Sequence, residues 1–395
     1  MKQKKMTIAY FFAVFLFLGL YFSMLQRVVG EIGLKYGLGN TALGLIITMT
    51  FVGFTISPIL TGEATDRFGR RIVVTFAFGC MLVGFALAFF VRSALGVGVG
   101  FFISGLAFGM FEMTLSSILA DVDPENAGKV LIYSRMCYAL GTIAGPFIAM
   151  GLLERFQDWA AVMALDSVLL LVLLVIFLRI SYPTPVYPNR IERPEDRQPV
   201  TFRMLKNWVL IAFSIALMMY FAVEAGLTFY ASRYIATITQ NTLHITLALS
   251  VFWLFAAIGR LIAAQMKKNP HLMIGALTLI TGTGLAICLL TSNLTLSIIS
   301  FGVMGLGCSA VYPTILAAGS RRFPHYTATL FGILMSFGGL GGILQPLVMG
   351  AIADASVGMK PALAVCIVPL SIVFVLQIVL WKADRRTGKS IDSNE

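Results

Sequence analysis

The sequence predicts an all-α membrane protein with twelve transmembrane helices arranged in two pseudo-symmetric six-helix bundles. Three observations predict this fold class: the composition, the number of long apolar segments, and a repeat between the two halves of the chain. Of the 395 residues, 58% are hydrophobic and only 12% are charged, and the mean hydropathy is +0.89. Soluble domains carry roughly 25% charged residues. The composition therefore excludes an ordinary water-soluble fold.

Apolar segments long enough to span a membrane occur twelve times. A helix needs about 20 apolar residues to cross a hydrocarbon core of roughly 30 Å. In the first half of the chain, such segments lie near residues 7–30, 41–61, 72–91, 95–119, 129–152 and 159–180. In the second half, they lie near 207–231, 243–265, 272–291, 295–318, 326–353 and 361–381.

A repeat relates the two sets of six segments. At an offset of 200 residues, the matching pairs are Pro124 and Pro324, Gly105-Leu106 and Gly305-Leu306, Gly141 and Gly341, and Pro146 and Pro346. Between the halves, residues 181–206 are polar and rich in proline, which cannot continue a helix. We therefore expect an N-terminal bundle over 1–180, a cytoplasmic linker over 181–206, and a C-terminal bundle over 207–395 that ends in a short cytoplasmic tail.

The net charge of +11 has a topological explanation. Of the 29 Lys and Arg residues, 21 fall on one side of the predicted spans, 5 on the other side and 3 within the spans. Cytoplasmic loops of membrane proteins carry such an excess of basic residues. Both termini are therefore expected in the cytoplasm, and the chain in the lipid bilayer of the cell membrane. The same distribution argues against nucleic-acid binding.

Residues 62–71, which read G-E-A-T-D-R-F-G-R-R, are predicted to form a short loop between the second and third spans. Gly62 and Gly69 would let two helix ends approach closely. The spacing G-x-x-x-D-R-x-G-R-R resembles the loop signature of the major facilitator superfamily of secondary transporters. The resemblance implies alternating access by rocking of the two halves, a cavity lined mainly by helices 1, 4, 7 and 10, and a conformational latch. The latch residues would be Gly62, Asp66, Arg67, Gly69, Arg70 and Arg71. In the alternative interpretation, Asp66 caps a helix and the arginines anchor lipid headgroups.

Charged residues within the spans are functional candidates, because a charge inside the membrane is costly. Glu112 on the fourth span and Arg135 on the fifth lie at about the same depth in the membrane. We therefore expect that the two side chains can form an ion pair. The stretch G-M-F-E-M-T-L-S-S around Glu112 is similar to the fucose and glucose branch of the superfamily, which implies a role for this glutamate in proton coupling. The asparagine that usually follows the glutamate in that branch is missing here. A purely structural ion pair is the alternative.

Four further charged positions lie within the spans or at their ends, and the pairing of two of them is left open. Glu224 on the seventh span and Arg27 on the first are expected at similar depth, where they could form an outer gate. Arg27 could instead pair with Glu31, four residues later on the same helix. Arg260, near the inner end of the eighth span, is expected to extend toward the headgroups. Asp354, at the end of the eleventh span, is expected to have no special role.

The expected lining of the substrate cavity is aromatic and hydroxyl-bearing, since every asparagine lies in a loop or at a span end. The lining residues chosen from the sequence are Tyr138, Tyr220, Trp253 and Tyr312. The resemblance around Glu112 implies proton-coupled transport of a small organic solute such as a sugar or related polar solute. The aromatic lining favours the alternative, proton-driven efflux of amphipathic or drug-like compounds. No enzymatic motif, metal site or cofactor motif is present in the sequence, so a monomeric transporter without catalytic activity or cofactor is expected.

Overall fold

The computed structural model describes residues 2–122, 127–180, 206–266, 269–323, 327–355 and 358–386, and every regular element in these ranges is a helix. The N-terminal bundle contains α1 (Lys2–Tyr36), α2 (Asn40–Phe68), α3 (Arg70–Phe90), α4 (Ala94–Val122), α5 (Ala127–Phe156) and α6 (Ala160–Arg179). The C-terminal bundle contains α8 (Trp208–Ala236), α9 (Thr242–Ala264), α10 (Pro270–Leu290), α11 (Leu294–Cys308), α12 (Val311–Arg322), α13 (Thr327–Ala355), α14 (Met359–Ala364) and α15 (Ile367–Arg386).

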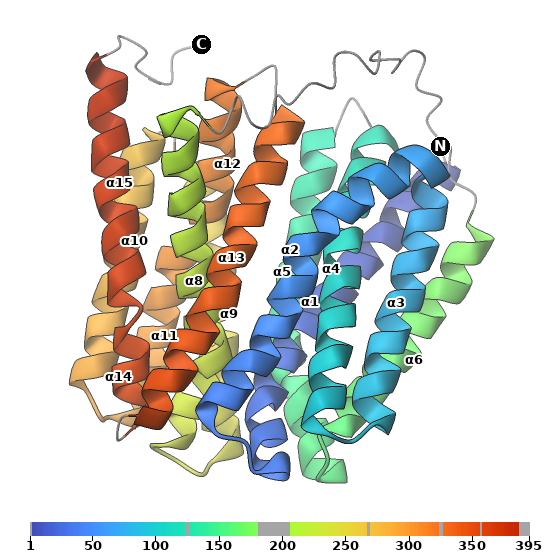
Figure 1. Cartoon of the computed structure of the whole chain (residues 1–395), viewed down its shortest axis with the longest axis horizontal. Helices are drawn as coiled ribbons and strands as arrows, with labels where there is room; N and C mark the ends of the chain where they lie inside the picture. The colour runs from blue at the N-terminus through green and yellow to red at the C-terminus, as the bar shows by residue number, and fades with distance from the viewer. Residues whose placement is uncertain are drawn as a thin grey trace.

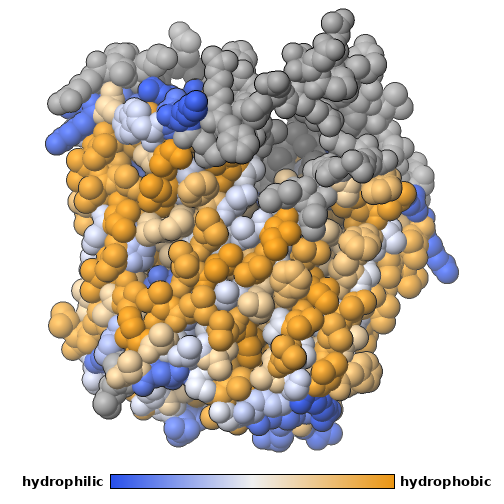
Figure 2. Space-filling model, viewed as in Figure 1, coloured by the Kyte–Doolittle hydropathy of each residue, from blue (hydrophilic) through white to orange (hydrophobic). Residues whose placement is uncertain are grey.

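The helices form twelve membrane spans within the described residues, which confirms the number predicted from hydropathy. On the face shown in Figure 2, apolar side chains cover the middle of the molecule, and hydrophilic residues gather toward its ends. Large side chains such as Phe90, Leu95 and Leu290 are more than three-quarters exposed. Apolar exposure on this scale requires lipid rather than water as surroundings. The chain is therefore a multi-pass membrane protein.

The start of α1 and the end of α15 lie at the same end of the molecule, at the top of Figure 1. We term this end the termini end, and the other the opposite end. The predicted linker over 181–206 lies outside the described residues except for Lys206. Its bounds, and the domain bounds drawn from it, stay predictions.

Small residues allow equivalent helices in the two bundles to pack closely. A Cβ atom at Gly105 in α4 would overlap the Thr50 carbonyl in α2. In the C-terminal bundle, a Cβ at Gly305 in α11 would overlap the Phe252 carbonyl in α9. The two glycines thus make the same approach in each bundle, as the sequence repeat predicts. The residues that they approach, Thr50 and Phe252, are 202 positions apart, whereas the two glycines are 200 positions apart.

The predicted loop over residues 62–71 is wrong. The second helix continues through Phe68, and the third begins at Arg70, so that only Gly69 interrupts them. Gly69 has a φ angle of 82°, a conformation that favours glycine. Among the described residues other than its chain neighbours, no atom lies within 4 Å of the place of a Cβ at Gly69, so its positive φ angle is the feature that favours glycine here. The segment before it contains Glu, Ala and Arg, which favour a helix, and no proline.

The tenth span is one span made of two helices, because α11 ends at Cys308 and α12 begins at Val311. Pro313 lies four residues after Ser309. Since proline has no backbone N–H, the Ser309 carbonyl loses the donor that a continuous helix would provide. The sequence analysis located this span but not its break.

Four asparagines at span ends cap helices instead of lining a cavity. Asn207, Asn241, Asn269 and Asn293 precede α8, α9, α10 and α11. Each side-chain oxygen accepts a hydrogen bond from a backbone N–H in the first turn of its helix. The amide groups of these residues are therefore engaged at the helix ends.

The two bundles meet mainly through α2 against α13 and through α5 against α9. Along α13, Gly350 approaches the backbone of Asn40, and Gly339 approaches Thr55 about half-way along α2. Toward the termini end, α2 and α13 diverge (Figure 1). The close packing between the bundles therefore runs from the opposite end to about the middle of these helices.

Candidate functional site

Glu112 of α4 and Arg135 of α5 form an ion pair between Oε1 and Nη1. The Arg135 Nη2 atom also lies 3.4 Å from Ser116 Oγ, and the guanidinium lies 5.3 Å from the centre of the Phe15 ring. Glu112 Oε2 is buried and has no hydrogen-bond partner among the described residues. The structure thus brings together the two charges that the sequence places at the same depth.

Glu224 lies roughly half-way along α8, where it contacts Tyr220 one turn earlier. The Tyr220 Oη atom is 2.9 Å from Glu224 Oε1 and 3.0 Å from the carbonyl oxygen of Cys308. Arg260 of α9 donates from Nε to the carbonyl of Ser309 at 3.0 Å. The expectation that Arg260 extends to the headgroups is wrong, because its side chain turns inward to the carbonyl that Pro313 leaves without a donor.

These two clusters lie within electrostatic range of each other across the bundle boundary. Arg135 and Glu112 are within this range of Tyr312 of α12, and Glu224 and Arg260 are within the same range of Tyr138 of α5. We term the whole set the central charged group, which comprises Glu112, Arg135, Tyr138, Glu224, Arg260 and Tyr312. The Arg135 side chain is 38% exposed, and it contacts Glu112, Ser116 and Phe15 of its own bundle.

Toward the opposite end, a hydrogen-bonded seam covers the central charged group. Gln26 of α1 donates to Thr228 of α8 at 2.9 Å and accepts from the indole N–H of Trp253 of α9 at 3.1 Å. The Phe22 ring packs edge-on against Trp253 and against Phe229. Trp253 is buried in this seam, so it closes the site on one side and does not present a free indole to it.

Arg27 pairs with Glu31 and not with Glu224. Its Nη1 atom lies 3.1 Å from Glu31 Oε1, and its Nε donates to Thr246 Oγ1 of α9 at 3.2 Å. Of the two pairings that the sequence left open, the structure contains the local one. Arg27 nevertheless joins the two bundles, through Thr246.

At the opposite end, Asp354 of α13 accepts hydrogen bonds from the start of α2. Its two carboxylate oxygens lie 2.7 Å from the backbone nitrogens of Asn40 and Thr41, and 2.6 Å from the Thr41 hydroxyl. Arg233 of α8 donates to the Asn40 side chain as well. We term these four residues the opposite-end clasp. The sequence analysis gave Asp354 no role, because nothing in the sequence shows which helix start lies beside it.

A second charged cluster ties the N-terminal bundle together at the same end. Asp158, between α5 and α6, lies 2.8 Å from Lys35 Nζ and 3.8 Å from Arg92 Nη1, and accepts from the Ala160 N–H at 3.0 Å. Desolvation raises the pKa of Asp158, but the hydrogen bonds from Lys35 and Ala160 and the charges of Lys35 and Arg92 outweigh it. The pKa of this carboxyl is therefore lower than usual.

The latch residues are described only in part. The backbone of Gly62, Asp66 and Arg67 belongs to α2, but their surroundings lie outside what the structure describes. Arg70 begins α3. Arg71 donates to the Leu178 carbonyl at the end of α6 at 2.9 Å, a contact within the N-terminal bundle. The latch role therefore stays a prediction.

Comparison with family models gives a match over residues 6–395. The model of the Major Facilitator Superfamily matches residues 6–274 and 235–395. The 4-hydroxybenzoate transporter PcaK of Pseudomonas aeruginosa is 27% identical over 147 residues, which cover 36% of this chain and 32% of that transporter. The chain thus matches about a third of the length of this relative. The putative niacin/nicotinamide transporter NiaP of Bacillus subtilis is 22% identical over 386 residues, 92% of each chain.

Solved structures share the fold. A D-xylose-proton symporter has a TM-score of 0.77 at 13% identity, with 95% of this chain and 96% of that chain covered. The nucleoside transporter NupG has a TM-score of 0.71 at 15% identity, with 97% and 99% covered. The transporter FucP in its outward conformation has a TM-score of 0.68 at 17% identity, with 95% and 99% covered. At these identities, the likeness shows the fold alone.

Proposed function

The chain belongs to the Major Facilitator Superfamily, and from that membership we propose that it moves a small organic solute across the membrane by alternating access, driven by protons. The observation that carries this proposal is the central charged group, to which both bundles contribute. Secondary transporters bind their solutes near the bilayer midplane, between two halves that rock against each other. A site that both halves share changes its geometry when they move, which links binding to movement.

The termini end faces the cytoplasm in this proposal. The excess of basic residues in the segments on that side supports the orientation. The packing of α2 against α13 and the opposite-end clasp then seal the outer side. In this form, a solute would reach the central charged group from the cytoplasm. The outward-open form would require the clasp and the seam around Gln26 to separate.

A small aromatic carboxylic acid is the solute class that this site suits best. Arg260 bonds the Ser309 carbonyl through Nε, so its planar fork of terminal N–H groups can still meet a carboxylate. Tyr138 and Tyr312 add ring faces and hydroxyl groups from the two bundles. The names of two relatives, a 4-hydroxybenzoate transporter and a putative niacin/nicotinamide transporter, support the same class.

A sugar fits the site less well. Sugar recognition relies on several amide and hydroxyl groups that are free to bind the solute. Here the amide of Gln26 is already bonded to Thr228 and Trp253, and asparagines at the span ends cap helices. Proton-driven efflux of amphipathic compounds is the second candidate function. The aromatic seam of Phe22, Trp253 and Phe229 beside the central charged group favours it.

Reconstitution into liposomes tests these alternatives. The panel would contain 4-hydroxybenzoate, nicotinic acid, D-xylose, L-fucose, uridine and the lipophilic cation tetraphenylphosphonium. Exchange of labelled for unlabelled solute without a pH gradient reports transport, and uphill accumulation under an imposed pH gradient reports proton coupling. We expect exchange and accumulation of the aromatic acids above the level of protein-free liposomes, with accumulation abolished by a protonophore. Exchange of none of these solutes would contradict the proposal.

A further inference from the structure

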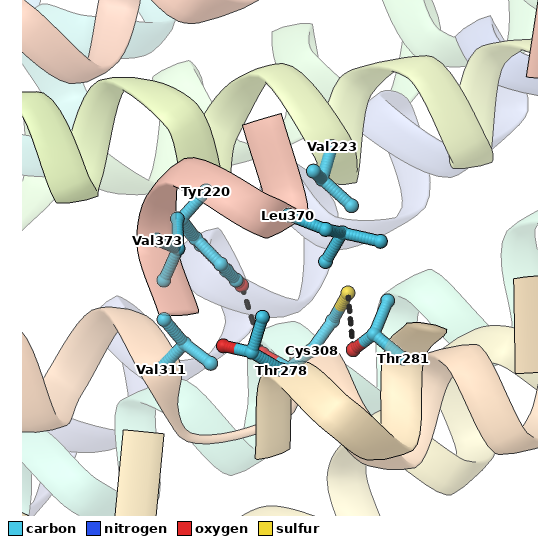
Figure 3. Close-up of a pocket in the computed structure, with 8 residues that line it drawn as sticks. All are labelled: Tyr220, Val223, Thr278, Thr281, Cys308, Val311, Leu370 and Val373. Carbon is cyan, nitrogen blue, oxygen red and sulfur yellow. Dashed lines mark hydrogen bonds between the residues drawn. The ribbon is translucent and has the colours of Figure 1, made fainter. Parts of the chain in front are cut away.

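The hydrogen bonds that Tyr220 makes near the break between α11 and α12 depend on a single proton, that of the Tyr220 hydroxyl group. Tyr220 reaches from α8 to the Cys308 carbonyl at the end of α11, at 3.0 Å (Figure 3). The same hydroxyl lies 2.9 Å from Glu224 Oε1. A phenol has one proton to donate, whereas a carbonyl oxygen and an ionised carboxylate can only accept. Whenever Glu224 is ionised, two acceptors therefore compete for the one proton of Tyr220.

Protonation of Glu224 removes this competition. The carboxyl O–H can then donate to Tyr220 Oη, and the Tyr220 hydroxyl can donate to the Cys308 carbonyl. The bond from Glu224 to Tyr220 and the bond from Tyr220 to Cys308 then form at the same time. Tyr220 is only 4% exposed, and in such surroundings a buried acceptor without a donor is costly. The Tyr220 hydroxyl and the Cys308 carbonyl thus both accept a hydrogen bond within this group only when Glu224 carries the proton.

The break depends on these donors because the helix cannot supply its own. Pro313 has no N–H for the Ser309 carbonyl, and Arg260 Nε takes its place at 3.0 Å. The positive charge of Arg260 also acts on Glu224. An ionised Glu224 therefore attracts both donors that hold the break: the Tyr220 hydroxyl and the Arg260 guanidinium.

We propose that Glu224 is a proton-binding residue that controls the break between α11 and α12. With the proton bound, Tyr220 and Arg260 hold the carbonyls of Cys308 and Ser309. When the proton passes to water, both donors turn toward the carboxylate and the break is released. The second helix of this span, α12, carries Tyr312 of the central charged group, which lies within electrostatic range of Arg135 in the other bundle, so a movement of α12 moves a member of that group. Its role in transport rests on the proton coupling proposed above.

The central charged group contains two carboxyl groups. Glu224 is the one that contacts Tyr220, at 2.9 Å, whereas Glu112 is paired with Arg135 of its own bundle. Besides Tyr220, the titratable or charged side chains within electrostatic range of Glu224 are Tyr138 of α5, Arg260 of α9, Cys308 of α11 and Tyr312 of α12. Cys366, between α14 and α15, lies within that range of Cys308. On the same elements, α5 also carries Arg135, and α9 carries His244 near its start. Tyrosines and thiols are ordinarily neutral at pH 7, and an arginine is always charged. On α1, Arg27 is engaged with Glu31. A proton that changes the bonding of the Tyr220 hydroxyl is therefore assigned to Glu224, the carboxyl group that contacts it.

A small cavity gives the break room to move. It has a volume of about 10 Å³ and lies beside Tyr220, Cys308 and Val311 (Figure 3). This is the lower limit of the space that one water molecule needs. Protein interiors are otherwise close-packed, so a void at this point lets the Tyr220 hydroxyl and the Cys308 carbonyl separate without a clash.

Amide hydrogen exchange of the full chain in liposomes tests the proposal without any solute. The readout is the exchange of residues 305–316, corrected for the intrinsic pH dependence of exchange. In the wild type, we expect about fivefold faster exchange at alkaline than at acidic pH, as the loss of a hydrogen bond predicts. In Glu224→Gln, the amide N–H₂ can donate to Tyr220 at every pH, so we expect slow exchange and no pH dependence.

Tyr220→Phe removes the donor to Cys308, and we expect fast exchange at every pH. Tyr234→Phe is the matched control, because it removes a bond from the same helix to the Cys288 carbonyl at 3.1 Å, away from Glu224. It should keep the wild-type pH dependence. If Glu224→Gln does not fold, the comparison of wild type with Tyr220→Phe decides.

A pH dependence that survives in Glu224→Gln or in Tyr220→Phe would overturn the proposal. So would wild-type exchange that does not change with pH. Failure of the proposed function would look different. No solute of the panel would then exchange, although the break still responded to pH through Glu224.

Discussion

The carboxylate of Asp354, at the end of α13, caps the start of α2 in the other bundle through the backbone N–H and the hydroxyl of Thr41, at 2.7 and 2.6 Å. A helix start leaves several N–H groups without partners and carries a partial positive charge. A residue just before the helix usually supplies the cap. Here the cap comes from the other bundle. The start of α2 is therefore capped only when the two bundles are in contact at the opposite end.

Replacement of Asp354 by alanine should shift the molecule toward opening at the opposite end. Loss of a helix cap costs about 0.5–2 kcal/mol, which corresponds to a several-fold change in the ratio of open to closed forms. Thr48, whose hydroxyl donates across the boundary to the Ile343 carbonyl at 2.9 Å, provides the reporter position. The rate at which an impermeant maleimide labels Thr48→Cys should rise in the Asp354→Ala background.

The asparagine variant serves as the control for this experiment. Asp354→Asn keeps one acceptor oxygen and loses the charge, so its labelling rate should fall between those of wild type and Asp354→Ala. The protein without the introduced cysteine gives the background from the five native cysteines. Equal labelling of Thr48→Cys with and without Asp354→Ala would show that the clasp does not contribute to closure.

Removal of Glu112 should destabilise the protein through Arg135. In Glu112→Gln, the arginine loses its counter-charge, although 38% of its side chain is exposed and can be partly hydrated. The loss should therefore be about 1–3 kcal/mol, less than that for a fully buried pair. The double variant Glu112→Gln/Arg135→Gln should recover part of it. Thermal unfolding in detergent measures both, with Glu154→Gln at the exposed end of α5 as the control. Simple additivity of the two losses would contradict an interaction between the pair.

The same Glu112→Gln variant separates proton coupling from a structural role. If Glu112 carries the coupling proton, the variant should keep solute exchange and lose accumulation under a pH gradient. If the pair is structural, exchange and accumulation should decline together with the amount of folded protein. Comparison of the two transport modes in the same liposomes makes this distinction, because exchange needs no net movement of protons.

The sequence predicts well what depends on local composition and depth. Twelve spans follow from hydropathy, because each span must be apolar whatever lies beside it. Glu112 and Arg135 meet because they share a depth on neighbouring helices that run in opposite directions. The repeat locates Gly105 and Gly305 at equivalent contacts. None of these inferences requires knowledge of how the two bundles dock.

The features that the sequence analysis missed depend on docking or on details of the backbone. Asp354 gains its role only from the start of α2, which is more than 300 residues away in the chain. Arg260 turns inward because Pro313 leaves a carbonyl without a donor on another helix. The proline was the available signal for this break. Residues 62–68 extend a helix although their charge density is typical of a loop.

Acid should weaken the cluster around Asp158. The pKa of this carboxyl is lower in the folded protein than its ordinary value of 3.8, chiefly because the contacts with Lys35 and the Ala160 N–H overcome desolvation. The ionised form is thus favoured by folding. Its contribution to stability is present above pH 3.8 and is lost as the pH falls through the lower folded-state pKa.

The difference in stability between wild type and Asp158→Asn isolates this contribution from the other carboxyl groups. Thermal unfolding from neutral to acidic pH should show the wild type to be more stable near neutrality and the two proteins to converge in acid. Lys35→Ala should reduce the difference, because it removes the nearest cation. A difference that stays constant over the whole pH range would refute the assignment.

Replacement of Asp66 by asparagine tests the latch that the resemblance implies. A latch that stabilises one conformation by a coupling free energy of about 1–3 kcal/mol should, when lost, reduce transport by about tenfold. Expression and thermal stability should stay normal, because the backbone at this position continues α2 to Phe68. Glu63→Gln is the matched control, since it removes the same charge from the same turn of helix but lies outside the G-x-x-x-D-R-x-G-R-R spacing. Should Asp66→Asn transport like the wild type at normal expression, the acid is not part of a latch. If instead its stability falls while the rate per folded molecule is kept, Asp66 acts as a structural residue at the membrane surface.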